Sequence, residues 1–340
     1  MRSILVLVTL AAVGACSSTS TSSDGKPTPT RTDGGSTSGN GAGAPDTGSP
    51  AEIVATAECD AMAKCDVYGM SVTYGDYATC VQRRTLANGS AFSAPKHAWV
   101  DAASARACAA ALAAEACHNG VLGNRHHVDA CRFAGALAKG AACSRDGQCQ
   151  SGACTGSDTA CGTCTELPSR KLGEVCNDTV EPSSGCRDPR TVCSKQRCVA
   201  LLRAGEACDR RADVGCEVGL DCVNDKCTAQ GTEVGAACDP NGETKPQCSR
   251  GLALVCDAGT CQKMELVAPG GVCNGSARAQ CRAGRCEKSL TSSGQKVCYG
   301  NLADGAACKT DLATDPLCMP PARCMAGNCR VPTPADLRCD

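Results

Sequence analysis

The chain has 340 residues, a formal net charge of −1, and 33 cysteines, while only 2% of its residues are aromatic. So few aromatic side chains exclude a base-stacking platform for single-stranded nucleic acid, and the near-neutral charge argues against electrostatic capture of nucleic acid. We therefore expect no nucleic-acid partner.

The first fifteen residues have the pattern of an export signal. Arg2 is followed by an apolar run from Ile4 to Val13. That run is too short to span a bilayer, but its length and its basic flank are typical of the apolar part of a signal peptide. We predict a signal peptide over residues 1–15.

The end of this signal carries a resemblance to a known processing site. Val13-Gly14-Ala15-Cys16 resembles the bacterial lipobox, in which small residues precede a cysteine that is acylated and becomes the mature N-terminus. The resemblance implies that Cys16 carries lipid, palmitate included, and anchors the protein to a membrane. Ser17, in place of aspartate, implies the outer membrane. An ordinary signal peptide cut near Ala15 is the alternative.

Residues 17–50 have the composition of a flexible linker. Ser, Thr, Gly and Pro fill 26 of these 34 positions. Such a segment cannot bury enough apolar surface to offset the entropy of ordering. We predict that residues 16–50 form a lipidated N-terminus and a disordered tether, with an r.m.s. reach of roughly 30 Å.

Residues 51–138 are richer in alanine and predict a small helical domain. Helices are expected over Ala51–Asp66, Asp76–Leu86 and Val100–Cys117, the first with Ser49 and Pro50 as its start signals. We expect disulfides to staple these helices in pairs. The six cysteines of this segment are Cys59, Cys65, Cys80, Cys108, Cys117 and Cys131.

Residues 139–340 repeat a cysteine pattern. Six times, a glycine stands three positions before a cysteine that opens a new cluster, at intervals of 30 to 35 residues. This periodicity predicts an array of six small disulfide-rich modules, because one aromatic residue (Tyr299) in the whole segment leaves little apolar mass for a conventional core. Modules 1 to 6 open at Cys143, Cys176, Cys208, Cys238, Cys273 and Cys308.

Each module also contains a C-x4-C pair with turn-forming residues inside it. We predict that every such pair forms a tight two-stranded ribbon with one cysteine on each arm. Modules 1 and 5 differ from the other four because they have further cysteines after the pair. The six pairs are Cys149/Cys154, Cys193/Cys198, Cys222/Cys227, Cys256/Cys261, Cys281/Cys286 and Cys324/Cys329.

The G-x-x-C opening and the run CSRDGQCQSGAC at 143–154 resemble the Dickkopf-type N-terminal cysteine-rich motif. Repeats of this kind occur in bacterial cysteine-rich surface lipoproteins. The likeness covers module 1 well and the other modules loosely. It implies a small disulfide-rich fold and an extracellular setting, and the signalling role of the animal proteins does not transfer with it.

The cysteine count predicts a bridge between modules. Without Cys16 an even number of cysteines remains, and an odd number lies on each side of every module boundary. Full pairing therefore requires an odd number of disulfides across each boundary. Either Cys161 or Cys164 pairs with Cys339 and folds the array back on itself, or bridges step from module to module. The fold-back is simpler, since each four-cysteine module stays self-contained.

Candidate chemistry is sparse along the chain. Cys161-Gly-Thr-Cys164 follows a polar loop rather than opening a helix, which favours structural disulfides over redox activity or a zinc site. The run Asp239–Glu243 spaces oxygen donors as calcium loops do, but it reads more simply as a turn. We expect no catalytic residue, no metal ligand and no cofactor. The four histidines, His97, His118, His126 and His127, occur in no catalytic motif.

These patterns predict a lipoprotein of the cell surface or outer membrane. It would display a disulfide-rich array for binding, adhesion or structural support. Its partners would be the membrane, through the N-terminal lipid, and a protein or other ligand of the cell envelope. The alternative is an exported enzyme with a site in the helical segment 51–138. Metal storage by free thiolates is a third possibility.

Overall fold

The computed structural model describes most of the compact unit Asp46–Asp340. The signal peptide, Cys16, most of the tether and all four histidines lie outside the described residues. Within the described part, none of the helices is both long and apolar enough to cross a membrane. The described residues are 48–94, 100–115, 117, 128–155, 161–166, 170–176, 186, 190–210, 215–273, 278–288, 294–309, 318–333 and 339.

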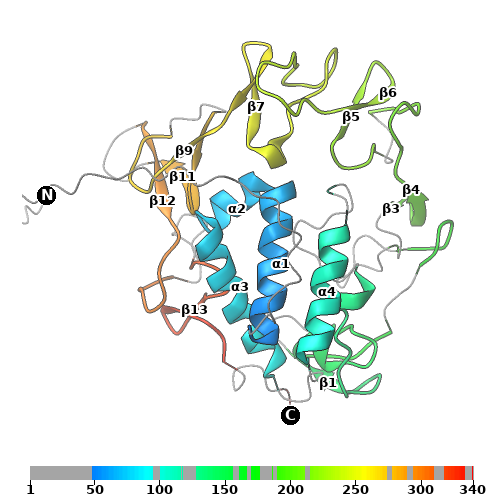
Figure 1. Cartoon of the computed structure of the whole chain (residues 1–340), viewed down its shortest axis with the longest axis vertical. Helices are drawn as coiled ribbons and strands as arrows, with labels where there is room; N and C mark the ends of the chain where they lie inside the picture. The colour runs from blue at the N-terminus through cyan, green and yellow to red at the C-terminus, as the bar shows by residue number, and fades with distance from the viewer. Residues whose placement is uncertain are drawn as a thin grey trace, which may run out of the picture. The chain divides into compact units, whose positions relative to one another are not determined.

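Four helices form the first part of the described chain: α1 (Pro50–Cys65), α2 (Val67–Thr73), α3 (Tyr77–Phe92) and α4 (Ala102–Ala114) (Figure 1). The three predicted helices are confirmed, and α3 extends beyond the expected end at Leu86. The expected start signal of α1 is also confirmed, since the Ser49 side chain accepts a hydrogen bond from the Glu52 amide and Pro50 opens the first turn.

α2 was not among the predicted helices, because its β-branched residues and its glycine give it a low helix propensity. Asp66 caps the helix, because its carboxylate accepts a 2.8 Å hydrogen bond from the Gly69 amide. Met70 and Tyr74 pack with Met62 of α1 in one buried cluster. Capping and tertiary packing thus stabilise a helix that local propensity disfavours.

An apolar core and three disulfides hold the helical segment together. Ile53 and Val54 of α1 pack against Leu112 of α4, together with Val100 and Val128. Of the disulfides, Cys59–Cys80 joins α1 to α3, Cys65–Cys117 ties the end of α1 to the chain beyond α4, and Cys108–Cys131 ties α4 to a short 3-10 turn. The expectation that disulfides staple the helices in pairs is thus confirmed for α1 and α3, while the other two bridges tie a helix to a neighbouring turn or loop.

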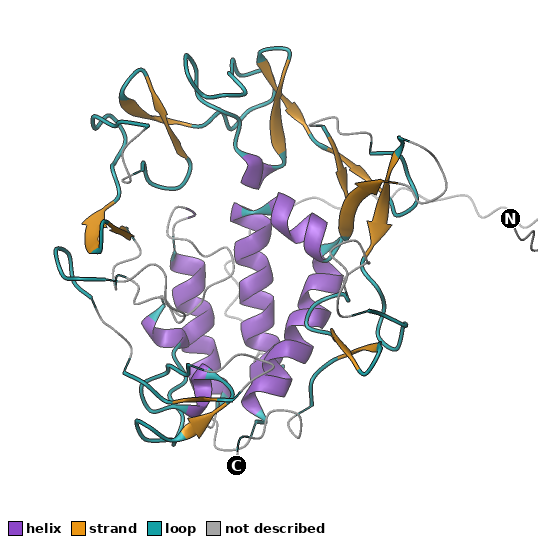
Figure 2. Ribbon diagram, turned by 180° about the vertical axis from the view of Figure 1, so that it is seen from behind, coloured by secondary structure: helices purple, strands orange, loops and turns teal. Residues whose placement is uncertain are grey.

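The array is made of short strands in two-stranded sheets (Figure 2). All pairs are antiparallel except β9–β10. The array is thus a small disulfide-rich fold, and a disulfide-stapled helical segment precedes it in the chain. The strands are β1 (Ala142–Cys143), β2 (Gly162–Thr163), β3 (Thr191–Ser194), β4 (Arg197–Ala200), β5 (Leu220–Val223), β6 (Lys226–Ala229), β7 (Leu254–Asp257), β8 (Thr260–Lys263), β9 (Glu265–Val267), β10 (Ala279–Cys281), β11 (Gly284–Lys288), β12 (Lys296–Gly300), β13 (Arg323–Met325) and β14 (Asn328–Arg330).

The predicted ribbon is confirmed in four modules and wrong in two. In modules 2, 3, 4 and 6 the C-x4-C cysteines face each other across β3–β4, β5–β6, β7–β8 and β13–β14. In modules 1 and 5 the facing cysteines are instead Cys154 with Cys164 and Cys286 with Cys298. The arms in these two modules are joined by a longer loop, so the C-x4-C spacing falls between the second and third cysteines.

A single disulfide pattern unites all six modules. The first cysteine bonds to the third, and the second bonds to the fourth, so the two bridges cross in sequence. Module 1 follows this pattern when Cys161, which bonds outside the module, is set aside and Cys164 is counted as its fourth cysteine. The twelve bridges are Cys143–Cys154 and Cys149–Cys164, Cys176–Cys193 and Cys186–Cys198, Cys208–Cys222 and Cys216–Cys227, Cys238–Cys256 and Cys248–Cys261, Cys273–Cys286 and Cys281–Cys298, and Cys308–Cys324 and Cys318–Cys329.

The glycine that precedes each module has a conformational role. In every module its amide donates a 2.7–2.8 Å hydrogen bond to the carbonyl of the fourth cysteine, and its φ lies between 82° and 88°. An added Cβ would meet nothing within 4 Å. Glycine is therefore required by the left-handed backbone, which L side chains rarely adopt, and not by lack of space. The six are Gly140, Gly173, Gly205, Gly235, Gly270 and Gly305.

Candidate functional site

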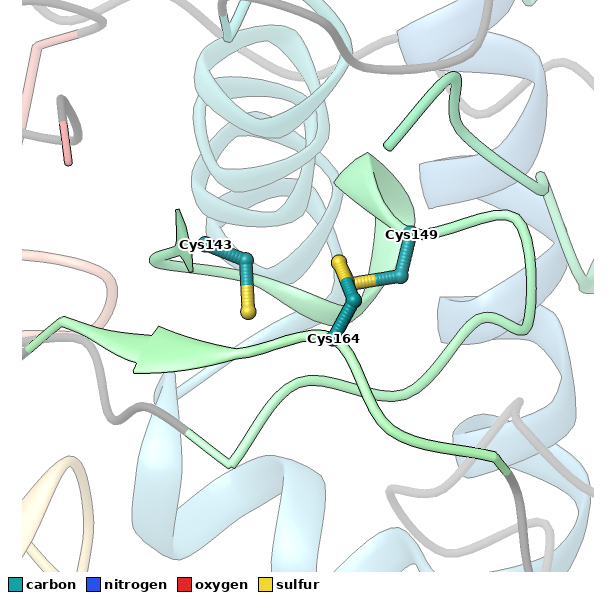
Figure 3. A group of neighbouring side chains, drawn as sticks. All are labelled: Cys143, Cys149 and Cys164. Atoms are coloured by element: carbon teal, nitrogen blue, oxygen red, sulfur yellow. A yellow bond between two sulfur atoms is a disulfide. The ribbon is translucent and has the colours of Figure 1, made fainter. Parts of the chain in front are cut away.

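Clusters of cysteine sulfur atoms are the first candidate site in each module. In module 1 the Sγ atoms of Cys143, Cys149 and Cys164 lie within 4.8 Å of one another (Figure 3). Cys149 and Cys164 are bonded to each other, however, and Cys143 is bonded to Cys154. Metals bind cysteine as a thiolate, so these sulfur atoms are the core of the module rather than a ligand set.

The C-x-x-C pair of module 1 is divided between two bridges. Cys164 closes its own module by bonding to Cys149, whereas Cys161 bonds to Cys339 across a sequence separation of 178. The structure thus has the fold-back pairing and uses Cys161, not Cys164, for it. Sixteen disulfides account for every cysteine except Cys16. A C-x-x-C whose cysteines have different partners is not the dithiol of a redox motif.

The Asp239 loop, which spaces oxygen donors like a calcium site, uses its carboxylate internally. The Asn241 amide donates to Oδ1 at 2.9 Å, and the Glu243 and Thr244 amides each donate to Oδ2 at 3.0 Å. These backbone hydrogen bonds lower the pKa of Asp239 to about 2. The carboxylate thus organises a turn, as the simpler reading of the sequence proposed.

A groove lies between α1 and α4 in the helical segment. Its volume is about 570 Å³, its floor includes Ile53, Ala57 and Leu112, and its rim carries Asp60 and Arg106. Asp60 is engaged there, because the Tyr77 hydroxyl donates to its Oδ1 at 2.7 Å. That hydrogen bond raises the pKa of Tyr77 to about 12. The histidines that an enzyme in segment 51–138 would use lie outside the described residues, so that alternative stays a prediction.

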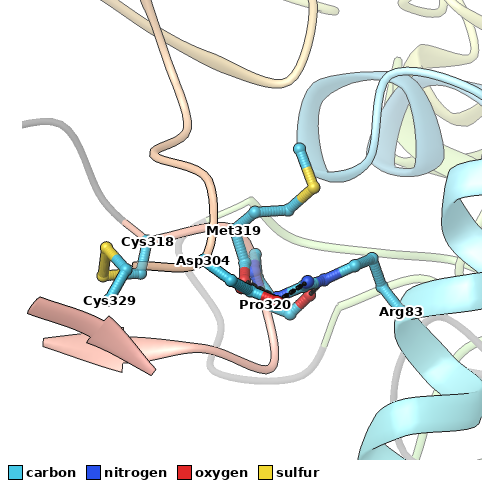
Figure 4. Close-up of polar contacts among 6 residues, drawn as sticks. All are labelled: Arg83, Asp304, Cys318, Met319, Pro320 and Cys329. Carbon is cyan, nitrogen blue, oxygen red and sulfur yellow. Dashed lines mark hydrogen bonds and ion pairs between the residues drawn. A yellow bond between two sulfur atoms is a disulfide. The ribbon is translucent and has the colours of Figure 1, made fainter. Parts of the chain in front are cut away.

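A densely hydrogen-bonded polar site lies where α3 meets module 6 (Figure 4). The guanidinium of Arg83, whose side chain is 8% exposed, forms two parallel hydrogen bonds with the Asp304 carboxylate, at 2.7 and 2.8 Å. Two further donors, on Nη2 and Nε, bind the main-chain carbonyls of Met319 and Pro320, both at 2.7 Å. A charged group with this many charge-assisted bonds fixes module 6 in one orientation on α3.

A second seam joins α2 to modules 4 and 5. The Arg250 guanidinium lies over the Tyr68 ring, 4.6 Å from its centroid, and donates a 2.7 Å hydrogen bond to the Tyr68 hydroxyl. That hydroxyl donates in turn to the Gln280 side chain at 3.0 Å. Close by, the Ala283 amide donates to the Ser71 carbonyl at 2.9 Å, and β11 contacts α2, as Figure 1 shows.

Sequence reasoning missed both seams. Arg83 and Asp304 are 221 positions apart, and Tyr68 and Gln280 are 212 apart. Arg83 stands in a helix beside another arginine, Arg84, and nothing local distinguishes one from the other. The one related signal was the parity of the cysteines, which required bridges between modules but left open whether the array folds back or the bridges step along it.

Comparison with known proteins finds no match. No family model, no curated protein and no solved structure matches this chain.

Proposed function

We propose that this protein is a lipid-anchored surface protein of a bacterial envelope, whose disulfide-rich array is displayed for binding, adhesion or structural support. Cys16 would hold it in the outer membrane, and residues 17–50 would lift the folded unit away from the lipid. The ligand would be a protein or another component of the cell envelope.

One observation carries the proposal: the array is covalently locked. Twelve disulfides close six modules on one pattern, and Cys161–Cys339 joins the two ends of the array. Disulfides persist in oxidising compartments outside the cytosol, and they let small modules keep their form with almost no apolar core. An array of such modules offers a large surface for little core, which suits recognition.

Membrane fractionation tests the anchor. Cys16→Ser should move the protein from the membrane fraction to the soluble fraction, and metabolic labelling with palmitate should be lost. Ser18→Ala, which leaves Val13–Cys16 intact, is the matched control and should stay in the membrane. A Cys16→Ser variant that remains membrane-bound would contradict the lipid anchor.

Accessibility on intact cells tests display. A short epitope inserted between Ala258 and Gly259, in the turn of the β7–β8 ribbon, should bind antibody on unpermeabilised cells. An insertion at this turn leaves the paired arms, Leu254–Asp257 and Thr260–Lys263, unchanged. Staining that appears only after permeabilisation would place the array inside the envelope. Crosslinking on the same cells would then identify the partner.

A further inference from the structure

The two ends of the array meet although they are far apart in the chain. Closing a loop of 178 residues has an entropic cost that grows with its length. The disulfides inside the modules shorten this loop, but none of them links one module to another, so none places Cys161 beside Cys339. Some other contact must hold the two ends near each other.

Module 1 is attached next to the C-terminal end of α3. Cys131 is bonded to Cys108, and Phe133, two residues further on, packs edge-to-face against Phe92, with ring centroids 5.2 Å apart and an interplanar angle of 80°. Gly135, in the same connecting segment, donates from its amide to the carbonyl of Cys149 in module 1 at 2.9 Å, so this segment is bound to the module. Phe92 is the last residue of α3.

Module 6 is attached along the same helix. Arg83 binds Asp304 and two carbonyls of the segment Met319–Pro320, as described above. Two turns later, the Ser90 hydroxyl donates a 2.6 Å hydrogen bond to the Pro332 carbonyl, seven residues before Cys339. The helix therefore contacts module 6 at residues that precede the β13–β14 ribbon in the sequence and at a residue that follows it.

The two modules face a common cavity on this helix. It has a volume of about 360 Å³ and is lined by Ala87 and Ser90 of α3, Arg145 of module 1 and Arg323 of module 6. Burial, and then the charge of Arg145, lower the pKa of Arg323. Two like charges repel, so this contact does not itself draw the modules together. The contacts with α3 have to do so.

We propose that α3 is a template on which the Cys161–Cys339 disulfide closes. By packing Phe92 against Phe133, in the segment that leads into module 1, and by binding module 6 at Arg83 and Ser90, the helix raises the effective concentration of one thiol at the other. Closure consumes a disulfide oxidant such as oxidised glutathione. One S–S bond forms in the protein, the S–S bond of the oxidant breaks, and the two protons leave with the two thiols released.

Solvent exposure should allow a thiol reagent to reduce the Cys161–Cys339 bridge without reducing the others. Cys161 is the one exposed cysteine among the 32 that pair, while the others are buried or half-buried. Thiol–disulfide exchange requires access to a sulfur atom. The closing bridge should therefore open and re-form in the folded protein while the module cores remain oxidised.

The test is the effective concentration of the Cys161–Cys339 pair. The full exported chain is equilibrated in buffers of reduced and oxidised glutathione, trapped by alkylation, and mapped by peptide mass spectrometry. Arg83→Gln should lower the effective concentration about tenfold, equivalent to about 1.4 kcal/mol. Arg83→Lys keeps the charge but loses the planar guanidinium group. Its effective concentration should lie between those of the wild type and Arg83→Gln. Ser90→Ala should lower it about twofold to threefold.

Arg278→Gln is the matched control. It removes an arginine from an exposed ion pair with Asp257, at 3.5 Å, away from α3. It should change the value by less than twofold. Mapping of the other fifteen bridges reports whether each variant has folded. If Arg83→Gln loses those bridges, Asp304→Asn and Ser90→Ala decide instead. Folded variants with the effective concentration of the control would overturn the template.

Discussion

The helical segment and the array are stabilised in different ways. In the helical segment, aliphatic side chains such as Val54 and Leu112 fill a core, and three disulfides reinforce it. In the described part of the array, cysteine is the main buried apolar residue, joined by Ala153, Val223, Leu254, Ala322 and Pro332. The difference teaches that covalent bridges can replace apolar volume where a module is too small to bury a core of its own.

Full reduction should separate the two regions most strongly. A native bridge in a small secreted unit typically contributes about 2–5 kcal/mol, and the modules have almost nothing else. Reduced protein should lose the protease resistance of 139–340 while helical circular dichroism falls only in part. Limited proteolysis with fragment mapping measures this. An array that resists protease after complete reduction would show that the comparison is wrong.

Removing apolar volume should have its largest effect in the helical segment. Leu112→Ala, at a position 3% exposed between α4 and α1, should destabilise the helices by about 2–5 kcal/mol. Denaturant unfolding followed by circular dichroism under oxidising conditions measures the loss. Ala113→Gly at an exposed position of the same helix is the control, expected to cost about 1 kcal/mol. If Leu112→Ala lowers the free energy of unfolding by no more than the control does, the helical segment is not stabilised by an apolar core.

One substitution should have opposite signs in the two regions. Gly235→Ala places a side chain at φ 88° and should destabilise module 4 by about 1–2 kcal/mol. Gly89→Ala, within α3, meets only the Ala51 Cβ at 4.0 Å and should stabilise the helix by up to about 1 kcal/mol. Hydrogen exchange of module 4 and α3 amides resolves each effect locally. Equal signs would contradict the backbone argument.

The smallest expected effect is a pH dependence of module 4. The pKa of Asp239 is lowered from 3.8 to about 2 in the folded state. A lowered pKa adds stability above the unfolded value, and this stability is lost as pH falls through the folded value. The Asp239 turn should therefore loosen between about pH 4 and pH 2, and Asp239→Asn should remove that dependence. Amide exchange of Glu243 and Thr244 across this range measures it.

The sequence was informative where the signal is local. Alanine content and start signals identified α1, α3 and α4, while α2 was missed because its stability comes from the Asp66 cap and from packing against α1. Cysteine spacing identified six modules, yet it could not show which pair faces across the ribbon in modules 1 and 5. Cysteine spacing gives only the number of residues between two cysteines. It does not show which of the loops in a module connects the two strands of the ribbon.

The site was less predictable than the fold. Parity required a bridge across every module boundary, and Cys339 was available to form it. Nothing in the sequence paired Arg83 with Asp304, because their contact depends on the route of an array more than two hundred residues long. Long-range polar contacts of this kind follow from the fold and leave no periodic trace.

The crossed bridges have a consequence for a chain that has been cut. Every peptide bond from Cys143 to Cys339 lies inside at least one disulfide-closed loop, and the same holds from Cys59 to Cys131. A single cleavage in either stretch therefore leaves one covalent molecule, and the nick is visible on a gel only after reduction. The stretch between Cys131 and Cys143 is spanned by no bridge. It is the one internal place where a protease can sever array from helices without reduction. After that cut, noncovalent contacts such as those at Arg83, Ser90 and Tyr68 would keep the two parts together.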